Sequence, residues 1–175
     1  MIAIFSNYLN QSEYKLIRKF ARFALNKLVR TSRQKKARIT ICISSQEEIK
    51  QKESDSNFRM HEAWCVYKGT DSNSYKQFEI VLNVKRINRR AKKQIVQFKN
   101  LLTDLGHEMV HVSQYLNSEM FDYVNGDVRY RGVVYDSSHY NDEEKYFFSP
   151  REVAAYGMEK GLYTLFCKQY SKNYE

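Results

Sequence analysis

Residues 107–111 read His-Glu-Met-Val-His, an H-E-x-x-H pattern within a stretch of apolar residues at helical spacing. Positions i and i+4 of a helix lie one turn apart on the same face, so His107 and His111 can reach one metal ion only if this stretch is helical. We therefore predict a long helix over about 89–117, with Asn88 as its N-cap. The residues around the motif carry little charge, which favours burial on most sides: they include Leu105, Met109, Val110 and Val112.

Two histidines with a glutamate between them form the pattern of a zinc site. Glu108 lies beside both ligands and is the predicted general base, accepting a proton from a zinc-activated water. With 4 His in 175 residues, chance alone gives this pattern in roughly 0.7% of such chains. The alternative interpretation is a polar turn of a surface helix on which His107 and His111 happen to align.

A catalytic zinc needs a third protein ligand. Glu152 follows His111 by 41 residues, Glu159 comes two helical turns later, and His139 lies between the motifs. Local chemistry favours Glu152, and leaves His139 and Glu159 open. Glu152 has a competing interpretation, because Ser149 and Glu152 have the spacing of a capping box that begins a helix. Weaker candidates are Asp122, Asp127 and Asp136.

The remaining patterns predict an α+β fold in a single domain over 1–175, long enough for one core. Asn10 and Glu13 have capping-box spacing before a predicted amphipathic helix, and Met1 to Phe5 is a strand or a packed tail. We expect helices over 11–31 and 150–170, strands over 38–44, 61–69 and 75–84, an extra β segment over 127–136, and a loop over 46–60. The last two strands of the first group form a hairpin around the turn-forming residues 69–74.

The chain is basic, with 29 Lys and Arg against 20 Asp and Glu and a net charge of +9. Two clusters, 33–38 and 85–93, are either a surface for nucleic acid or an acidic protein, or a solvated basic face. Three widely spaced cysteines do not form a disulfide framework and favour a reducing compartment. No apolar run approaches about 18 residues, so we expect no membrane partner.

The combination of HEMVHVSQY, an extra β segment and SPREVAAYGMEKG resembles small gluzincin-type (minigluzincin) metallopeptidase domains. It is most similar to the HExxH proteins of tailed phages that are described as SprT-like. The motifs cover about 90–170, and the order of elements agrees over 11–170. The resemblance implies a zincin-like fold with an N-terminal helix, a small twisted mixed sheet, an active-site helix, a short β segment and a C-terminal helix with the third ligand. It makes His107, His111 and Glu152 the Zn2+ ligands and Glu108 the general base.

The function that the resemblance implies is zinc-dependent hydrolysis of a protein or peptide substrate in an infected bacterial cytoplasm or a virion. The strand over 78–84 is then the expected cleft edge that pairs with an extended substrate. An oxyanion stabiliser is also expected, and several tyrosines are near the motifs. Tyr156, one turn after Glu152, is our candidate catalytic tyrosine, as a group supporting the ligands.

Three other functions are compatible with the sequence. One is a DNA-associated, SprT-like protease that uses its basic surface, for which steep salt dependence of DNA binding would be the sign. Another is a zinc-stabilised module that binds nucleic acid or protein without turnover, against which the presence of Glu108 argues. The third is a zinc hydrolase whose substrate is not a peptide.

Overall fold

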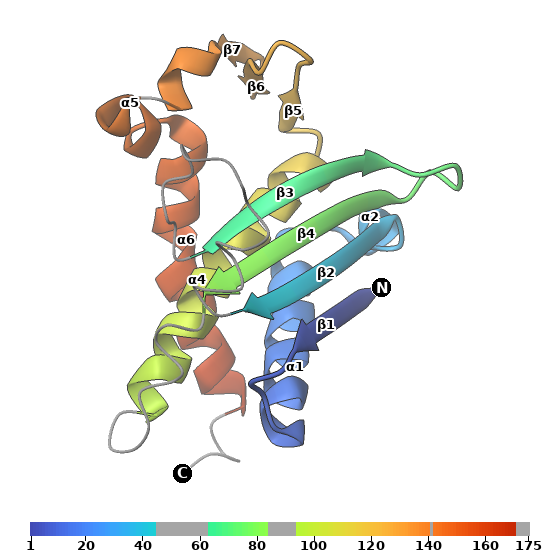
Figure 1. The fold of residues 1–175 in the computed structure, drawn as a ribbon, viewed down its shortest axis with the longest axis vertical. Coiled ribbons are helices and arrows are strands. Elements are labelled where there is room, and N and C mark those ends of the chain that lie inside the picture. Colours follow the sequence, from blue (N-terminus) through green and yellow to red (C-terminus); the bar gives the residue numbers. More distant parts are fainter. Residues whose placement is uncertain (45–62, 84–93, 141, 171–175) are drawn as a thin grey trace.

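The computed structural model describes residues 1–44, 63–83, 94–140 and 142–170, which form a mixed α+β structure as expected (Figure 1). The N-terminal part contains β1 (Ile2–Ser6), α1 (Gln11–Leu28), α2 (Thr31–Gln34), β2 (Ala37–Ser44), β3 (Ala63–Thr70) and β4 (Lys76–Asn83). The C-terminal part contains α4 (Gln94–Leu116), β5 (Met120–Asp122), β6 (Val128–Tyr130), β7 (Val133–Tyr135), the 3-10 turn η2 (Ser137–Tyr140), α5 (Glu143–Phe147) and α6 (Pro150–Tyr170). None of the helices in these ranges combines the length and apolarity needed to cross a membrane.

The main sheet has the order β1-β2-β4-β3, with β1, β2 and β4 parallel and β3 antiparallel to β4. Strand β2 alternates buried and half-buried residues along its whole length, the period of a sheet with one covered face. Helices α1 and α4 contact this sheet, and Figure 1 shows them on one side of it. The core forms between the two layers and includes Ile17, Phe20, Ile41, Ile80 and Leu105.

The predicted hairpin is confirmed, since β3 and β4 are antiparallel neighbours. The expectation that residues 78–84 form the cleft edge is wrong. Strand β4 is hydrogen-bonded on both sides, to β2 and β3, and β3 is the strand at the end of the sheet. The short chain segment between the motif helix and α6 adds a separate antiparallel sheet, β5-β6-β7.

Helix α1 begins at the predicted cap: the side chain of Asn10 accepts from the Ser12 and Glu13 amides, and Glu13 accepts from the Asn10 amide. It ends at Leu28, earlier than the predicted 31, because Val29 takes an extended conformation and is buried in the core. The predicted loop over 46–60 lies outside the described residues. So do Asn88 and the predicted first turn of the motif helix.

Helices α4 and α6 pack closely at Gly106, directly before the first motif histidine. A Cβ at Gly106 would lie 3.4 Å from the Glu159 carbonyl oxygen and 3.5 Å from Cζ of Phe20. Such distances are ordinary van der Waals contacts for a Cβ, so α6 approaches α4 closely beside His107. This approach brings the predicted ligands of the two helices together.

Candidate metal centre

Three buried side chains from α4 and α6 direct one donor atom each to a common point. The His107 and His111 Nε2 atoms are 3.2 Å apart, and they lie 3.2 and 3.4 Å from Glu152 Oε2. A tetrahedral zinc with ligand distances of about 2.0 to 2.1 Å has its donors about 3.3 to 3.4 Å apart. The three donors are therefore spaced as three corners of such a tetrahedron, and the group could hold a metal ion.

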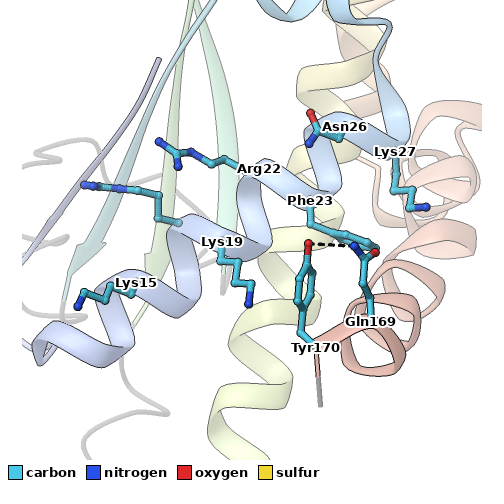
Figure 2. A pocket seen from close by; sticks show the side chains of 9 residues that line it. Lys15, Lys19, Arg22, Phe23, Asn26, Lys27, Gln169 and Tyr170 are labelled. Carbon is cyan, nitrogen blue, oxygen red and sulfur yellow. Dashed lines mark hydrogen bonds between the residues drawn. The ribbon is translucent and has the colours of Figure 1, made fainter. Parts of the chain in front are cut away.

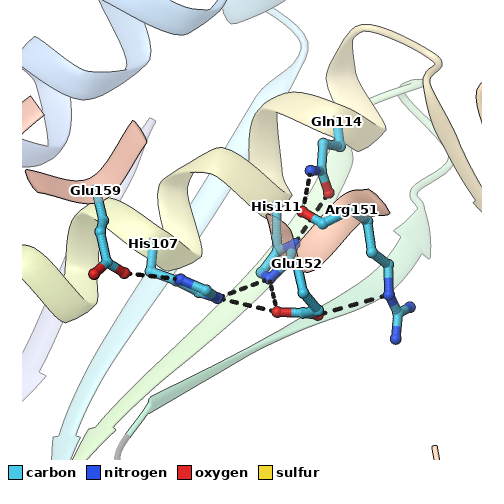
Figure 3. A network of polar contacts seen from close by, with 6 residues as sticks. All are labelled: His107, His111, Gln114, Arg151, Glu152 and Glu159. Carbon is cyan, nitrogen blue, oxygen red and sulfur yellow. Dashed lines mark hydrogen bonds and ion pairs between the residues drawn. The ribbon is translucent and has the colours of Figure 1, made fainter. Parts of the chain in front are cut away.

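Hydrogen bonds behind both imidazoles fix their orientation (Figure 3). The Nδ1–H of His107 donates to Glu159 Oε2 at 3.0 Å, and that of His111 donates to Gln114 Oε1 at 3.0 Å. Gln114 Nε2 in turn donates to the Arg151 carbonyl, which determines the orientation of its amide. With Nδ1 protonated, each neutral imidazole presents its Nε2 lone pair to the centre, as metal-ligating histidines do.

Without a metal, the electrostatics of the cluster favour a protonated His111 beside an ionised Glu152. Burial opposes charge on each group, but the hydrogen bonds from His107 and His111 hold the pKa of Glu152 well below its usual range. Burial also opposes charge on His111, yet the Glu152 hydrogen bond and the negative charges of Glu152 and Glu108 raise its pKa to about 9. The pKa of His107 is raised despite its burial, mainly by its hydrogen bond to Glu152. A bound cation would have to displace this proton.

Glu108 lies beside the donors and is almost completely buried, at 5% exposure. Burial raises the pKa of its carboxyl, an effect that the positive charges of His111 and His107 oppose. A carboxylate with a raised pKa accepts and returns protons more readily near neutral pH. Glu108 thus has the environment of a general base.

A cleft of about 320 Å³ opens beside the three donors. Its lining includes residues 63–67 of the edge strand β3 together with Glu108, His111 and Glu152. Tyr146 of α5 and Arg151 also line the cleft. Two of the three donor residues, His111 and Glu152, and the predicted general base therefore border one cavity together with a sheet edge.

The Glu152 carboxylate does not cap helix α6. Helix α6 does begin at Pro150, and the Glu152 and Val153 amides donate to the Ser149 carbonyl. The Glu152 carboxylate, however, faces His107 and His111. Within the described part of the chain the buried Ser149 hydroxyl has no hydrogen-bond partner, so the reciprocal capping box does not form.

The other predicted site residues have different positions. Glu159 lies on the far side of the His107 ring, where it orients the imidazole. His139 belongs to η2, and its side chain lies outside the described residues. Tyr156 packs edge-on against His107 with ring centroids 4.5 Å apart, and its side chain is 44% exposed. Tyr156 therefore packs against the side of the His107 imidazole.

Three neighbours of the centre were not assigned these positions by sequence reasoning. Gln114 is three residues after His111, so the i, i+3 spacing was an available signal for a partner behind the ligand. Arg151 follows the helix start directly and places its Nε 3.6 Å from Glu152 Oε1. Tyr146 carried no distinguishing signal among the many tyrosines, because only the packing of α5 against α6 brings it to the cleft.

The two predicted basic clusters differ in what the structure says of them. Residues 85–93 lie outside the described part of the chain. In 33–38, Arg33 donates to the Asn117 carbonyl and Arg38 forms a 2.8 Å ion pair with Asp71. Half of the cations in this cluster are therefore engaged within the protein.

No protein-family model matches the chain, and no match was found among curated proteins or among solved structures. The function must therefore be argued from the chemistry of this centre.

Proposed function

We propose that the protein is a zinc-dependent peptidase of the gluzincin type. The observation that carries the proposal is a buried group of three zinc-type donors, of which His111 and Glu152 border one cleft together with the buried Glu108 carboxylate. A polar cluster formed only to stabilise the fold would have no need of a cavity or of an additional buried carboxylate. Such buried charges are expensive unless they serve a function.

The donor set favours zinc over harder cations. Two imidazole nitrogens and one carboxylate oxygen are typical of catalytic zinc sites, which use three protein ligands and keep one position open. Magnesium and calcium prefer sites built from oxygen ligands alone. When bound at His107, His111 and Glu152, zinc would supply a Lewis acid that activates water and polarises the scissile carbonyl.

The side chains around the cleft can carry the proton transfers. Glu108 accepts the proton of the attacking water and later delivers it to the leaving amine. Burial and the negative charge of Glu152 raise the pKa of Tyr146, so its phenol stays protonated and can donate to a developing oxyanion. Arg151 adds a positive charge on the same side of the cleft.

The edge strand supports a peptide as the substrate. Within the described residues β3 is paired only with β4, and its residues 63–67 line the cleft. An extended peptide can add to such an edge through main-chain hydrogen bonds, which bind any sequence in the same way. An extended chain paired with the open edge of β3 would lie along the cleft that Glu108 also lines.

The test is to compare wild type with Glu108→Gln for zinc content and for cleavage of a quenched fluorescent peptide library and an unfolded protein. We expect one zinc per chain in both proteins, and a loss of cleavage of about 100- to 10,000-fold in Glu108→Gln. The matched control is Glu144→Gln, the same change at an exposed glutamate of α5, which should cleave normally. Equal cleavage by Glu108→Gln would exclude the mechanism. Stoichiometric zinc without cleavage of either substrate by wild type would instead indicate a binding module.

A further inference from the structure

The positive charge of the chain is concentrated at its N-terminal end. Residues 1–44 contain ten Lys and Arg and one acidic residue, Glu13, which makes this segment +9. The formal net charge of the whole chain is also +9, so the remaining residues are balanced. The excess positive charge therefore belongs to β1, α1, α2 and β2 and not to the part that carries the metal centre.

A second and larger cavity, of about 670 Å³, lies along the outer face of α1 where the end of α6 packs against it (Figure 2). We call it the α1 groove. Its lining contains no carboxylate and five cationic side chains, namely Lys15, Arg18, Lys19, Arg22 and Lys27. None of the residues that line the α1 groove also lines the cleft at the metal centre.

Acidic side chains in the described part of the chain do not neutralise these cations. Four of the five are exposed, and within the described residues none of the five forms an ion pair. Lys15 with Lys19, and Arg18 with Arg22, have the i, i+4 spacing at which like charges destabilise a helix. Two of the five lie over aromatic rings: the ammonium of Lys19 is 3.8 Å from the ring centroid of Tyr170, and that of Lys27 is 5.6 Å from that of Phe23. An anionic ligand would relieve this repulsion.

We propose that the α1 groove binds the phosphodiester backbone of a nucleic acid. From Lys15 to Lys27 the helix runs roughly 18 Å. One nucleic-acid strand carries one phosphate per about 3.4 Å, so this length faces about five phosphates. The amides of Asn26 and Gln169, also in the lining, are donors of the kind that contact phosphate and sugar oxygens.

The composition of the groove argues against an acidic protein or a membrane as the ligand. Protein interfaces place apolar and aromatic anchors at their centre and are depleted in lysine, whereas here Phe23 is 5% exposed and lysines dominate. A basic helix that binds a membrane inserts its apolar face. The apolar face of α1, with Ile17 and Phe20, is buried in the core and cannot insert.

The test measures binding of a labelled 20-nucleotide single strand and of a 20-base-pair duplex to the zinc-loaded protein by fluorescence anisotropy, between 50 and 300 mM salt. The variant is Lys15→Gln with Arg22→Gln, at two exposed positions. The matched control is Lys99→Gln with Lys160→Gln, which removes the same charge at exposed positions outside the groove. Circular dichroism and thermal unfolding verify that both variants fold as wild type does.

We expect wild type to bind at least one of the two forms. Comparing their affinities shows whether the groove binds single-stranded or double-stranded nucleic acid. Losing two phosphate contacts should reduce the slope of log K against log salt by roughly 1.4 to 1.8. This corresponds to roughly 25- to 60-fold weaker binding at 0.1 M salt, with a much smaller change in the control.

Four outcomes would overturn the proposal. The first is the absence of binding of either form at 50 mM salt. The second is an equal loss of affinity in the variant and the control, and the third is equally strong competition by poly-glutamate of the same charge. The fourth is loss on Arg89→Gln with Arg90→Gln but not on the α1 substitutions, which would place binding in the 85–93 cluster. Binding that is confined to vesicles with anionic lipid falls under the first of these outcomes. Because the assay needs no peptidase activity, its result is independent of the proposed enzymatic function.

Discussion

Replacing Glu152 and Glu159 separately tests which of them is the third ligand. Both carboxylates contact His107, but Glu152 contacts Nε2, the atom that points to the centre, and Glu159 contacts Nδ1 behind the ring. Glu152 also reaches His111 Nε2, at 3.4 Å. The structure thus predicts a ligand role for Glu152 and an orienting role for Glu159.

The two roles predict losses of different size. Zinc sites with four protein ligands bind with about 10 to 16 kcal/mol, so an equal share is about 2.5 to 4 kcal/mol per ligand. Glu152→Ala should therefore weaken zinc binding by about 100- to 1,000-fold. Removing a partner behind a ligand typically costs about 10- to 100-fold, which is the expectation for Glu159→Ala.

The assay is competition for zinc against a chromophoric chelator at pH 7.5, with the folded state of each variant verified by circular dichroism. Glu159→Gln is the matched control, because its amide oxygen can still accept from His107 Nδ1–H and most of the affinity should remain. A larger loss in Glu159→Ala than in Glu152→Ala would refute the assignment. Unchanged affinity in Glu152→Ala would return the third position to His139 or Glu159.

Two further predictions concern protons and the oxyanion. Because the pKa of metal-free His111 is raised to about 9 and that of His107 is also raised, zinc binding at pH 7.5 should release at least one proton, measurable by calorimetry in buffers of different ionisation enthalpy. By the same shifts, the stabilisation of the metal-free protein by this cluster is complete between about pH 4.5 and 6.5 and is lost as the pH rises through about 9. Urea unfolding at pH 6 and 9.5 would detect this loss, and equal stability at both would contradict the shifts. Tyr146→Phe in zinc-saturated protein should leave KM nearly unchanged and lower kcat by about 100- to 1,000-fold if its hydroxyl donates to the oxyanion, whereas an unchanged kcat would remove Tyr146 from that role.

Local patterns were sufficient to predict most of the elements. The i, i+3, i+4 spacing of apolar residues located α1 and α4, the start signal at Ser149 to Glu152 located α6, and the turn residues 69–74 located the β3–β4 hairpin. The prediction of the cleft edge failed because strand order is decided by pairing between segments distant in sequence. Strand β2 could pair with β4 only after the chain had passed through β3, and this crossover leaves β3 at the edge.

The candidate site divides in the same way. His107, Glu108 and His111 follow from one helical turn, because their relative placement depends only on the 3.6-residue period. The role of Glu152 could not be decided locally, since its spacing from Ser149 fits a cap as well as its chemistry fits a ligand. The approach of α6 to α4 at Gly106 decides it by bringing the Glu152 carboxylate to both imidazoles.

The sequence by itself therefore determined the helices, the strands and the pair of histidines, because these depend on residues within a few turns of one another. Only the tertiary structure decided which strand borders the cleft, which carboxylate joins the histidines and which tyrosine, Tyr146, lines the cleft. It also revealed that five cations of α1 border one groove. The strand, the carboxylate and the tyrosine reach the site from segments that are distant along the chain, and packing of the helices and the sheet fixes their distances.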